Sequence, residues 1–287
     1  MAHILDGKAV AARIKAEVAE GVAELRERGR AVRLGVILVG EDPASVTYVR
    51  NKQTDSAEVG IESKAHRFNE NVSQKELAAL VENLDEDEAV SGFFIQLPLP
   101  GGLEPLDLIS RIDPAKDVDG LSPASAGRLA VGLPSLLPCT PHGIVQMLKR
   151  SGIELEGREA VVLGRSNLVG KPLAQLLLRE NVTVTVCHSR TKDLPEVARR
   201  ADVLVAAVGR REVVGAEYVK DGAVVVDVGI HRNKDGGLTG DVKFDEVEPK
   251  ALHITPVPGG VGPMTRAMLL YNTLEAARAV EDTRKPW

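Results

Sequence analysis

The stretch Gly164-Arg165-Ser166-Asn167-Leu168-Val169-Gly170-Lys171-Pro172 decides the fold class of this chain. It follows the apolar run Ala160-Val161-Val162-Leu163 and opens a segment with the pattern of a helix. Glycines let a strand turn sharply into a helix whose first amides can bind a nucleotide phosphate. The spacing differs from the standard Gly-x-Gly-x-x-Gly, because Ser166 stands where that pattern has a glycine. The motif alone therefore fits either a dinucleotide site or an ordinary strand-to-helix turn.

The next β-branched run, residues 182–187, favours the dinucleotide interpretation. An NAD-preferring site places an acid at the end of this second strand, whereas this chain has His188-Ser189-Arg190 there. No carboxylate would repel a 2'-phosphate, and Arg165, Ser189 and Arg190 could donate hydrogen bonds to one. The sequence thus predicts NADP as cofactor, with a solvated basic turn as the alternative.

Composition limits the remaining possibilities. A chain of 287 residues that is 44% hydrophobic predicts two domains with substantial cores. A net charge of -5 and only 3% aromatic residues argue against nucleic-acid binding. The sequence contains neither a long apolar stretch nor a signal-like start, so we expect no membrane association and a cytoplasmic protein. The two cysteines, Cys139 and Cys187, are expected to be buried free thiols, and the histidine spacing predicts no metal site.

The periodicity predicts an α/β fold of two blocks with mostly parallel sheets, the second block being a Rossmann-type sheet. In block one we expect helices at 7–28, 43–59, 74–84 and 106–112 and strands at 34–39, 63–68 and 92–96. In block two we expect strands at 160–163, 183–187, 203–206 and 224–228 and a closing helix from 264 to about 280. Thr140 is expected to cap the helix that opens this block. The blocks are predicted to be joined by short segments, with a cleft between them.

Block one carries a second set of candidate residues. Ser45, Tyr48 and Lys52 fall on one face of the helix that Asp42 caps. Gln96 ends the last strand of the block, at the sheet edge where α/β folds bind their ligands. A solvated polar helix face is the alternative for the first three residues.

Several motifs, in order, resemble one known family. They are Tyr48-Val49-Arg50-Asn51-Lys52, Gln96-Leu97-Pro98-Leu99-Pro100, Lys116-Asp117-Val118-Asp119-Gly120, Pro138-Cys139-Thr140-Pro141, Gly164-Arg165-Ser166 with Val169-Gly170, and the run 256–263. From its first helix to its last, the chain resembles the bifunctional methylenetetrahydrofolate dehydrogenase/cyclohydrolase (FolD) family of one-carbon metabolism.

The resemblance implies the following chemistry. 5,10-Methylenetetrahydrofolate would be oxidised with NADP and then hydrolysed to 10-formyltetrahydrofolate. Lys52 would be the general acid/base of the hydrolytic step, Gln96 would hydrogen-bond it, and Tyr48 would pack on the folate rings. Asp119 would anchor the pterin, although an Asp before Gly120 can also simply form a turn.

The resemblance also implies the remaining contacts and the assembly. Residues 1–139, with the helix 264–287, would form the folate-binding catalytic domain, and residues 140–263 would bind NADP. The protein is expected to be a homodimer. The expected cofactor contacts are Thr140, Gly164, Arg165, Ser166, Val169, Gly170, Ser189, Arg190 and Ile230. Beyond the four catalytic candidates, the expected folate contacts are Ser45, Ile95, Leu97, Pro258, Gly259, Gly260, Gly262 and Pro263.

Two alternatives stay open at this point. A two-domain NADP-dependent dehydrogenase of a small acid, such as shikimate or an amino acid, would share the layout but would not need Gln96-Leu97-Pro98-Leu99-Pro100 together with Asp119. A nucleotide-sensing module without enzymatic activity is the other. The run Gly259-Gly260-Val261-Gly262 fits both a tight chain crossing and a folate-lining loop.

Overall fold

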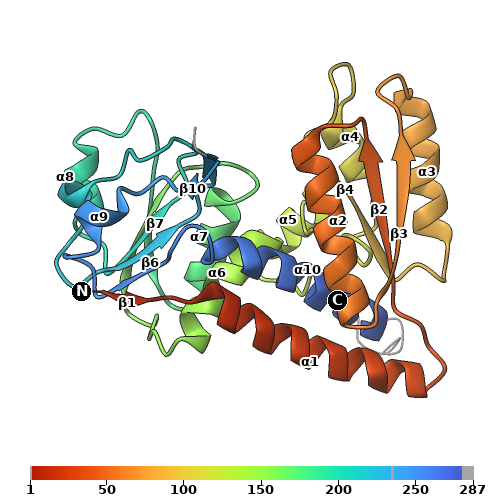
Figure 1. The fold of residues 1–287 in the computed structure, drawn as a ribbon, viewed down its shortest axis with the longest axis horizontal. Helices are drawn as coiled ribbons and strands as arrows, with labels where there is room; N and C mark the ends of the chain where they lie inside the picture. Colours follow the sequence, from red (N-terminus) through yellow and green to blue (C-terminus); the bar gives the residue numbers. More distant parts are fainter. Residues whose placement is uncertain (1, 234–235, 280–287) are drawn as a thin grey trace. The chain divides into compact units, whose positions relative to one another are not determined.

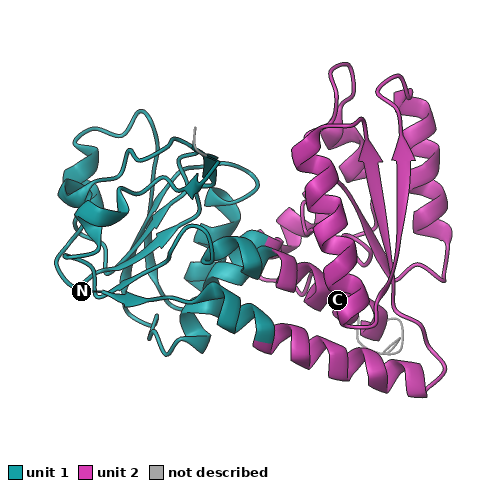
Figure 2. Cartoon of the chain, in the orientation of Figure 1, with its two compact units in different colours: residues 1–12, 140–265 teal, residues 13–139, 266–287 magenta. Residues whose placement is uncertain are grey.

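The computed structural model describes residues 2–233 and 236–279 (Figure 1). Within these residues the chain divides into two compact units (Figure 2). Unit 1 contains residues 2–12 and 140–265, and unit 2 contains residues 13–139 and 266–279. Helices α1 (Gly7–Glu27) and α10 (Val261–Ala279) each begin in unit 1 and continue into unit 2.

Unit 2 is built on a three-stranded parallel sheet in the order β3-β2-β4. The strands are β2 (Arg33–Val39), β3 (Glu62–Phe68) and β4 (Gly92–Ile95), and the helices wholly within the unit are α2 (Pro43–Glu58), α3 (Gln74–Glu86), α4 (Pro105–Ser110) and α5 (Pro123–Ala130). The central strand β2 is buried along almost its whole length, as expected of a parallel strand covered on both faces. Apolar residues of α3 and α4 pack against β2 and β4, and α2 and α3 flank the sheet (Figure 1).

Unit 1 is built on a six-stranded parallel sheet in the order β1-β11-β8-β7-β5-β6. Its strands are β1 (His3–Ile4), β5 (Glu159–Leu163), β6 (Thr183–Cys187), β7 (Val203–Ala206), β8 (Val224–Asp227) and β11 (His253–Ile254). The remaining elements are α6 (Cys139–Arg150), α7 (Gly170–Arg179), α8 (Leu194–Ala198), η1 (Ala216–Tyr218), α9 (Phe244–Val247) and the antiparallel pair β9 (His231–Arg232) and β10 (Leu238–Thr239). Because β5 pairs with β6 on one side and β7 on the other, the strand order reverses at β5, where such sheets bind their ligands.

The predicted fold class is confirmed, since both units are α/β with parallel sheets and the last described helix runs into the unit of the first block. The predicted cleft stays a prediction. The predicted strands and long helices are found with small shifts of their ends. The closing helix begins at Val261 instead of Met264, and the predicted end at Val280 lies outside the described residues.

Two local predictions are wrong. Thr140 does not cap α6, because the helix begins one residue earlier, and the Thr140 Oγ1 instead lies 2.8 Å from the Thr265 Oγ1. Residues 2–12 lie in unit 1, although the sequence analysis placed them with the first block. The reason is β1, which extends the unit 1 sheet by pairing with β11, His3 opposite His253 and Ile4 opposite Ile254.

Candidate functional site

Helix α2 places Tyr48 and Lys52 just after the central strand of unit 2. The chain leaves β2 through Gly40, whose φ of 80° suits glycine. Asp42 then caps the helix by accepting a 2.8 Å hydrogen bond from the Ser45 main-chain N. Ser45 is buried beside this cap, whereas Tyr48 is 47% exposed. The helix therefore presents Tyr48 as an accessible ring, while the burial of Ser45 already has a structural explanation.

Lys52 is held by neutral partners. Its Nζ donates a 3.3 Å hydrogen bond to the Gln96 Oε1 and lies 3.8 Å from the centre of the Phe94 ring. Gln96 is buried directly after β4, and its Nε2 donates to the Leu97 main-chain O at 2.7 Å, which turns Oε1 toward the lysine. Among the residues the structure describes, no carboxylate forms an ion pair with Lys52. The amine is thus oriented by an amide oxygen and an aromatic ring.

Asp119 and Asp117 occupy the same loop but do different work. Asp117 is buried, and its carboxylate accepts hydrogen bonds from the Leu121 N, the Ser122 N and the Ser125 Oγ at 3.2, 2.7 and 2.8 Å. Asp119 is half-buried. Burial raises the pKa of the Asp119 carboxyl, and the positive charge of Lys52 opposes that rise. Asp119 therefore shares its electrostatic surroundings with Lys52, while Asp117 builds the loop.

At the carboxyl edge of the unit 1 sheet, glycines allow close backbone contacts. Gly164 has φ 127°, and a Cβ on it would lie 2.1 Å from the Ala207 O. A Cβ on Gly170, the first residue of α7, would lie 2.1 Å from the Gly164 O. The Ser166 Oγ accepts a 3.1 Å hydrogen bond from the Val169 N. Among the described residues, the main-chain amides of 165–168 have no acceptor. These free amides before a helix fit a phosphate.

The predicted 2'-phosphate residues lie at the same edge. Strands β5 and β6 are neighbours, and the Gly164 N donates to the Cys187 O at 2.9 Å, so the turn after β5 adjoins the turn after β6. Arg165, Ser189 and Arg190 are all exposed, and the Arg190 main-chain N donates to the His188 Nδ1 at 3.1 Å. Within the described residues, no carboxylate pairs with either arginine. Both cations are therefore available to an anionic ligand.

The other predicted residues are distributed as follows. Unit 1 holds Thr140, Ile230 and the run 258–263, and a Cβ on Gly262 would lie 3.7 Å from the exposed Ile230 Cδ1. Unit 2 holds Ile95, which is buried, and Leu97, which is half-buried. The binding roles of these residues stay predictions.

Three residues around the unit 2 site were not predicted from the sequence. Phe94 supplies the ring over which the Lys52 Nζ lies. Asn272 of α10 donates from Nδ2 to the Val118 O and the Leu137 O, both at 2.8 Å, and thereby fixes the segment before Asp119. Asp55 pairs with Lys15 of α1 and Arg266 of α10. The alternation of β4 could have indicated that Phe94 and Gln96 share a face, but the partners of Asn272 and Asp55 are too distant in sequence for any pattern.

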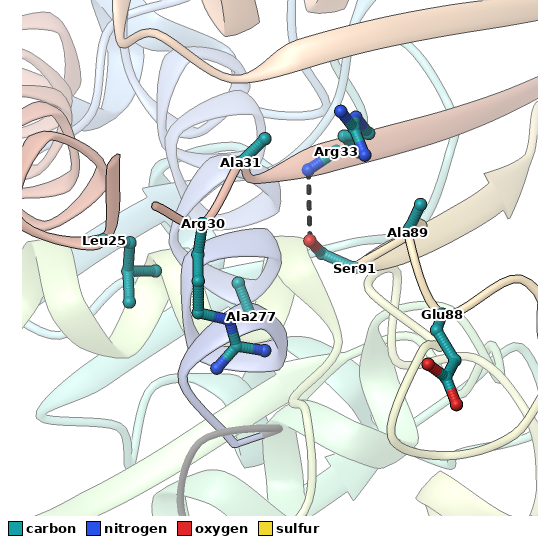
Figure 3. Close-up of a pocket in the computed structure, with 8 residues that line it drawn as sticks. All are labelled: Leu25, Arg30, Ala31, Arg33, Glu88, Ala89, Ser91 and Ala277. Atoms are coloured by element: carbon teal, nitrogen blue, oxygen red, sulfur yellow. Dashed lines mark hydrogen bonds between the residues drawn. The ribbon is translucent and has the colours of Figure 1, made fainter. Parts of the chain in front are cut away.

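Other features of the described residues do not add to the site. The pocket in Figure 3 is lined by Leu25, Arg30, Ala31, Arg33, Glu88, Ala89, Ser91 and Ala277. It adjoins the amino ends of β2 and β4, where the Arg33 N donates to the Ser91 Oγ, while Gln96 follows the carboxyl end of β4. Residues 2–233 and 236–279 contain no group of three side chains suited to a metal ion and no helix able to cross a bilayer. Both cysteines are free and buried, as predicted.

Comparisons with known proteins agree on one family. A model of the tetrahydrofolate dehydrogenase/cyclohydrolase catalytic domain matches residues 5–119, and a model of the NAD(P)-binding domain of the same family matches residues 138–281. Bifunctional protein FolD 1 of Rubrobacter xylanophilus is 74% identical over 98% of this chain and 99% of that protein.

Solved structures agree. The bifunctional FolD enzyme of Campylobacter jejuni is 47% identical with a TM-score of 0.96, covering 98% of this chain and 100% of that one. The Trypanosoma brucei FolD, in complex with NADP and an inhibitor, is 39% identical with a TM-score of 0.92. The match covers 98% of this chain and 99% of that one. A shikimate dehydrogenase from Aquifex aeolicus is 16% identical with a TM-score of 0.51, over 89% of this chain and 94% of that one. This similarity shows a shared fold alone.

Proposed function

This chain belongs to the tetrahydrofolate dehydrogenase/cyclohydrolase family, and we propose that Lys52 carries the hydrolytic half of its chemistry. The protein is a bifunctional enzyme of one-carbon metabolism. It oxidises 5,10-methylenetetrahydrofolate to 5,10-methenyltetrahydrofolate with NADP and hydrolyses that product to 10-formyltetrahydrofolate. The dehydrogenase of a small acid is not favoured, because shikimate dehydrogenase shares only the fold.

The contact between the Lys52 Nζ and the Gln96 Oε1 carries the proposal for hydrolysis. Attack of water on the methenyl carbon requires a group that accepts the proton of the water. The Gln96 amide fixes the direction of the amine without adding a negative charge, and the Phe94 ring covers one side of it. The cationic methenyl group beside Lys52 would favour loss of the lysine proton when a base is needed. Lys52 then donates this proton to the folate N5 as the bond between N5 and the hydrated carbon breaks.

Asp119 is proposed as the pterin anchor. A carboxylate accepts paired hydrogen bonds from an aminopyrimidinone edge, and no main-chain amide of the described residues donates to Asp119. The accessible Tyr48 ring is proposed to stack on the folate. Ser45, Ile95, Leu97, Pro258, Gly259, Gly260, Gly262 and Pro263 remain proposed folate contacts.

NADP is proposed to bind at the carboxyl edge of the unit 1 sheet, and when bound it accepts the hydride of the substrate. The free amides of 165–168 would hold its pyrophosphate, and Arg165, Ser189 and Arg190 its 2'-phosphate. Thr140, Gly164, Ser166, Val169, Gly170 and Ile230 complete the proposed contacts. By the same proposal, residues 140–263 form the cofactor domain, and residues 13–139 with the described part of α10 that follows Thr265 form the folate domain.

We also propose a homodimer formed through unit 1, in the cytoplasm. The edge strand β6 pairs only with β5 among the described residues, and it contains neither proline nor a charged residue. Such an edge accepts a strand from a second copy. Buried free cysteines need no oxidising compartment, which supports the location. Fractionation of cells tests it directly.

Lys52→Met tests the hydrolytic role. We expect cyclohydrolase activity to fall by at least about a hundredfold, because a positioned general base contributes on that scale. Lys75→Met, at an exposed position of α3, is the matched control and should be neutral. Decay of methenyltetrahydrofolate absorbance measures hydrolysis, and calorimetry with a folate ligand checks that binding persists. Hydrolysis by Lys52→Met at the parental rate would refute the role.

A further inference from the structure

Unit 1 contains two buried carboxylates to which the sequence analysis assigned no role. Asp227 ends β8, and Asp241 follows β10; they are 4% and 0% exposed. Buried carboxylates are costly unless their oxygens accept hydrogen bonds. Their partners therefore show what the two residues do.

Asp241 holds the loop that follows β7. Its Oδ2 accepts hydrogen bonds from the Val208 N at 2.7 Å and the Gly209 N at 2.9 Å. Its Oδ1 lies 2.8 Å from the His231 Nε2. The His231 side chain is 23% exposed. One carboxylate thus joins the loop after β7 to the hairpin β9–β10.

Asp227 in turn holds Asp241. Its Oδ1 accepts from the Gly229 N and the Asp241 N, and its Oδ2 accepts from the Val242 N, all at 2.9 Å. A Cβ on Gly240 would lie 1.8 Å from the Asp227 Oδ2, so the chain approaches as closely as glycine allows. These two carboxylates therefore connect the segments that follow β7, β8 and β10.

The loop held by Asp241 borders the proposed cofactor site. The Ala207 N donates to the Leu163 O at 2.8 Å, and the Ala207 O occupies the space that a Cβ on Gly164 would need. A shift of this loop would therefore disturb the turn after β5. Strand β7 is also the neighbour of β5 at the point where the strand order reverses.

We propose that Asp241 is a positioning residue for the dehydrogenase reaction, and that His231 supports it from the hairpin side. It keeps the loop after β7 in the shape that NADP binding requires. This inference rests on the proposed NADP site at the same edge. Because hydrolysis of methenyltetrahydrofolate consumes no NADP, a defect here should separate the two activities.

Asp202 provides a matched control in the same unit. Its Oδ2 accepts a 3.0 Å hydrogen bond from the Glu159 N and its Oδ1 pairs with the Lys220 Nζ, but it precedes β7 at the opposite, amino edge of the sheet. The Asp202 side chain is 29% exposed, whereas Asp241 is fully buried. If both carboxylates only stabilise unit 1, the two substitutions should affect NADP binding alike. A positioning role predicts a defect in NADP binding at Asp241 alone.

The experiment compares His231→Ala, His231→Gln, Asp241→Asn and Asp202→Asn with the parent. NADP binding is measured by calorimetry, together with the KM for NADP and the cyclohydrolase rate without NADP. His231→Ala and Asp241→Asn should weaken NADP binding about fivefold or more, as expected when a hydrogen bond to a carboxylate is lost. Cyclohydrolase activity should change less than about twofold, which lies within the tolerance of a neutral substitution. His231→Gln, which restores an N–H donor, should recover part of the affinity.

Unchanged NADP affinity in His231→Ala, or equal losses of both activities, would overturn the inference. Since His231 is partly exposed, this variant decides the matter even if Asp241→Asn fails to fold. A parent protein that binds NADP but lacks dehydrogenase activity would instead overturn the proposed function. In that case the binding data still test Asp241.

Discussion

At the scale of single residues, the neighbouring acids Asp117 and Asp119 have different roles. Asp117 stabilises its loop, and Asp119 is proposed to bind folate. Replacing Asp119 with Ala should abolish folate binding while leaving the melting temperature and NADP affinity unchanged. The donors of a buried pterin would lose their partner, which costs several kcal/mol of binding, whereas no main-chain donor depends on this carboxylate. Calorimetry with a folate ligand and thermal unfolding check both halves.

Asp117→Ala is the control with the opposite outcome. It leaves the Ser122 N and the Ser125 Oγ without their acceptor inside the protein, so unfolding should become easier by roughly 2 to 3 kcal/mol. If Asp119→Ala unfolds, or binds folate like the parent, Asp119 is a turn residue. The sequence could not separate the two, because the difference lies in the contacts of Asp117 with the start of α5, a helix the pattern did not predict.

Arg165 supports a prediction about cofactor choice. Arg165→Ala should raise the KM for NADP far more than the KM for NAD, because only NADP carries the 2'-phosphate. The side chain is exposed, so stability should stay within about 0.5 kcal/mol. Arg158 is exposed and lies just before the amino end of β5, whereas Arg165 follows the carboxyl end of that strand. Arg158→Ala should therefore leave both KM values unchanged. A parallel rise of both constants in Arg165→Ala would contradict the assignment.

At the scale of elements, one carboxylate joins three helices of unit 2. The Asp55 carboxylate on α2 is 6% exposed and pairs with Lys15 of α1 and with the Arg266 Nη1 of α10 at 3.0 Å. Asp55→Ala should lower the free energy of unfolding by roughly 2 to 4 kcal/mol, somewhat less than a fully buried pair because both cations are partly exposed. Urea denaturation measures this change.

Glu58 provides the comparison for Asp55. It also pairs with Lys15, at 2.9 Å, but its side chain is 57% exposed. Glu58→Ala should therefore cost less than about 1 kcal/mol, the usual value of an exposed pair. Equal effects of the two substitutions would show that Asp55 does not join the helices.

The elements that the sequence predicted are those with strong local signals. Strand β7 and the start of α2 were predicted to the residue, because an apolar run and an Asp-Pro cap are complete in themselves. Strand β1 was missed, since two residues form a strand only through pairing with β11 near the other end of the chain. Thr140 was misassigned for a related reason, as its partner Thr265 belongs to α10. The site residues that belong to local motifs could be predicted from the sequence. Those that depend on partners far away in the sequence could not.

At the scale of the whole molecule, the open edge of β6 predicts the assembly state. Sedimentation at micromolar concentration should give twice the mass of the 30.7 kDa chain. Val186, 38% exposed on β6, is the position for a test, because a charge at an edge strand opposes pairing with another chain. Val186→Lys should shift the protein toward monomer, and Val131→Lys, exposed in unit 2, should not. A monomeric parent would remove the homodimer from the proposal.

The pH dependence of folding depends on the same carboxylates that shape unit 1. Burial raises the pKa of Asp227 from 3.8 to about 6, although three main-chain amides oppose that rise. The folded protein therefore takes up this proton before the unfolded chain does as the pH falls. Proton uptake by Asp227 therefore stabilises the folded state; this contribution is complete below about pH 4 and is lost as the pH rises through 6.

Comparison with variants isolates this effect. The difference in unfolding free energy between the parent and Asp227→Asn should grow by about 1 kcal/mol from pH 7 to pH 5, since one pKa unit corresponds to about 1.4 kcal/mol. For Asp202 the opposite sign holds, because the hydrogen bond from the Glu159 N lowers its pKa, so its contribution is lost only below about pH 4. The difference between the parent and Asp202→Asn should thus stay constant from pH 7 to pH 5. If urea denaturation shows the Asp227 difference shrinking toward pH 5, the Asp227 carboxyl is not the buried acid that its surroundings indicate.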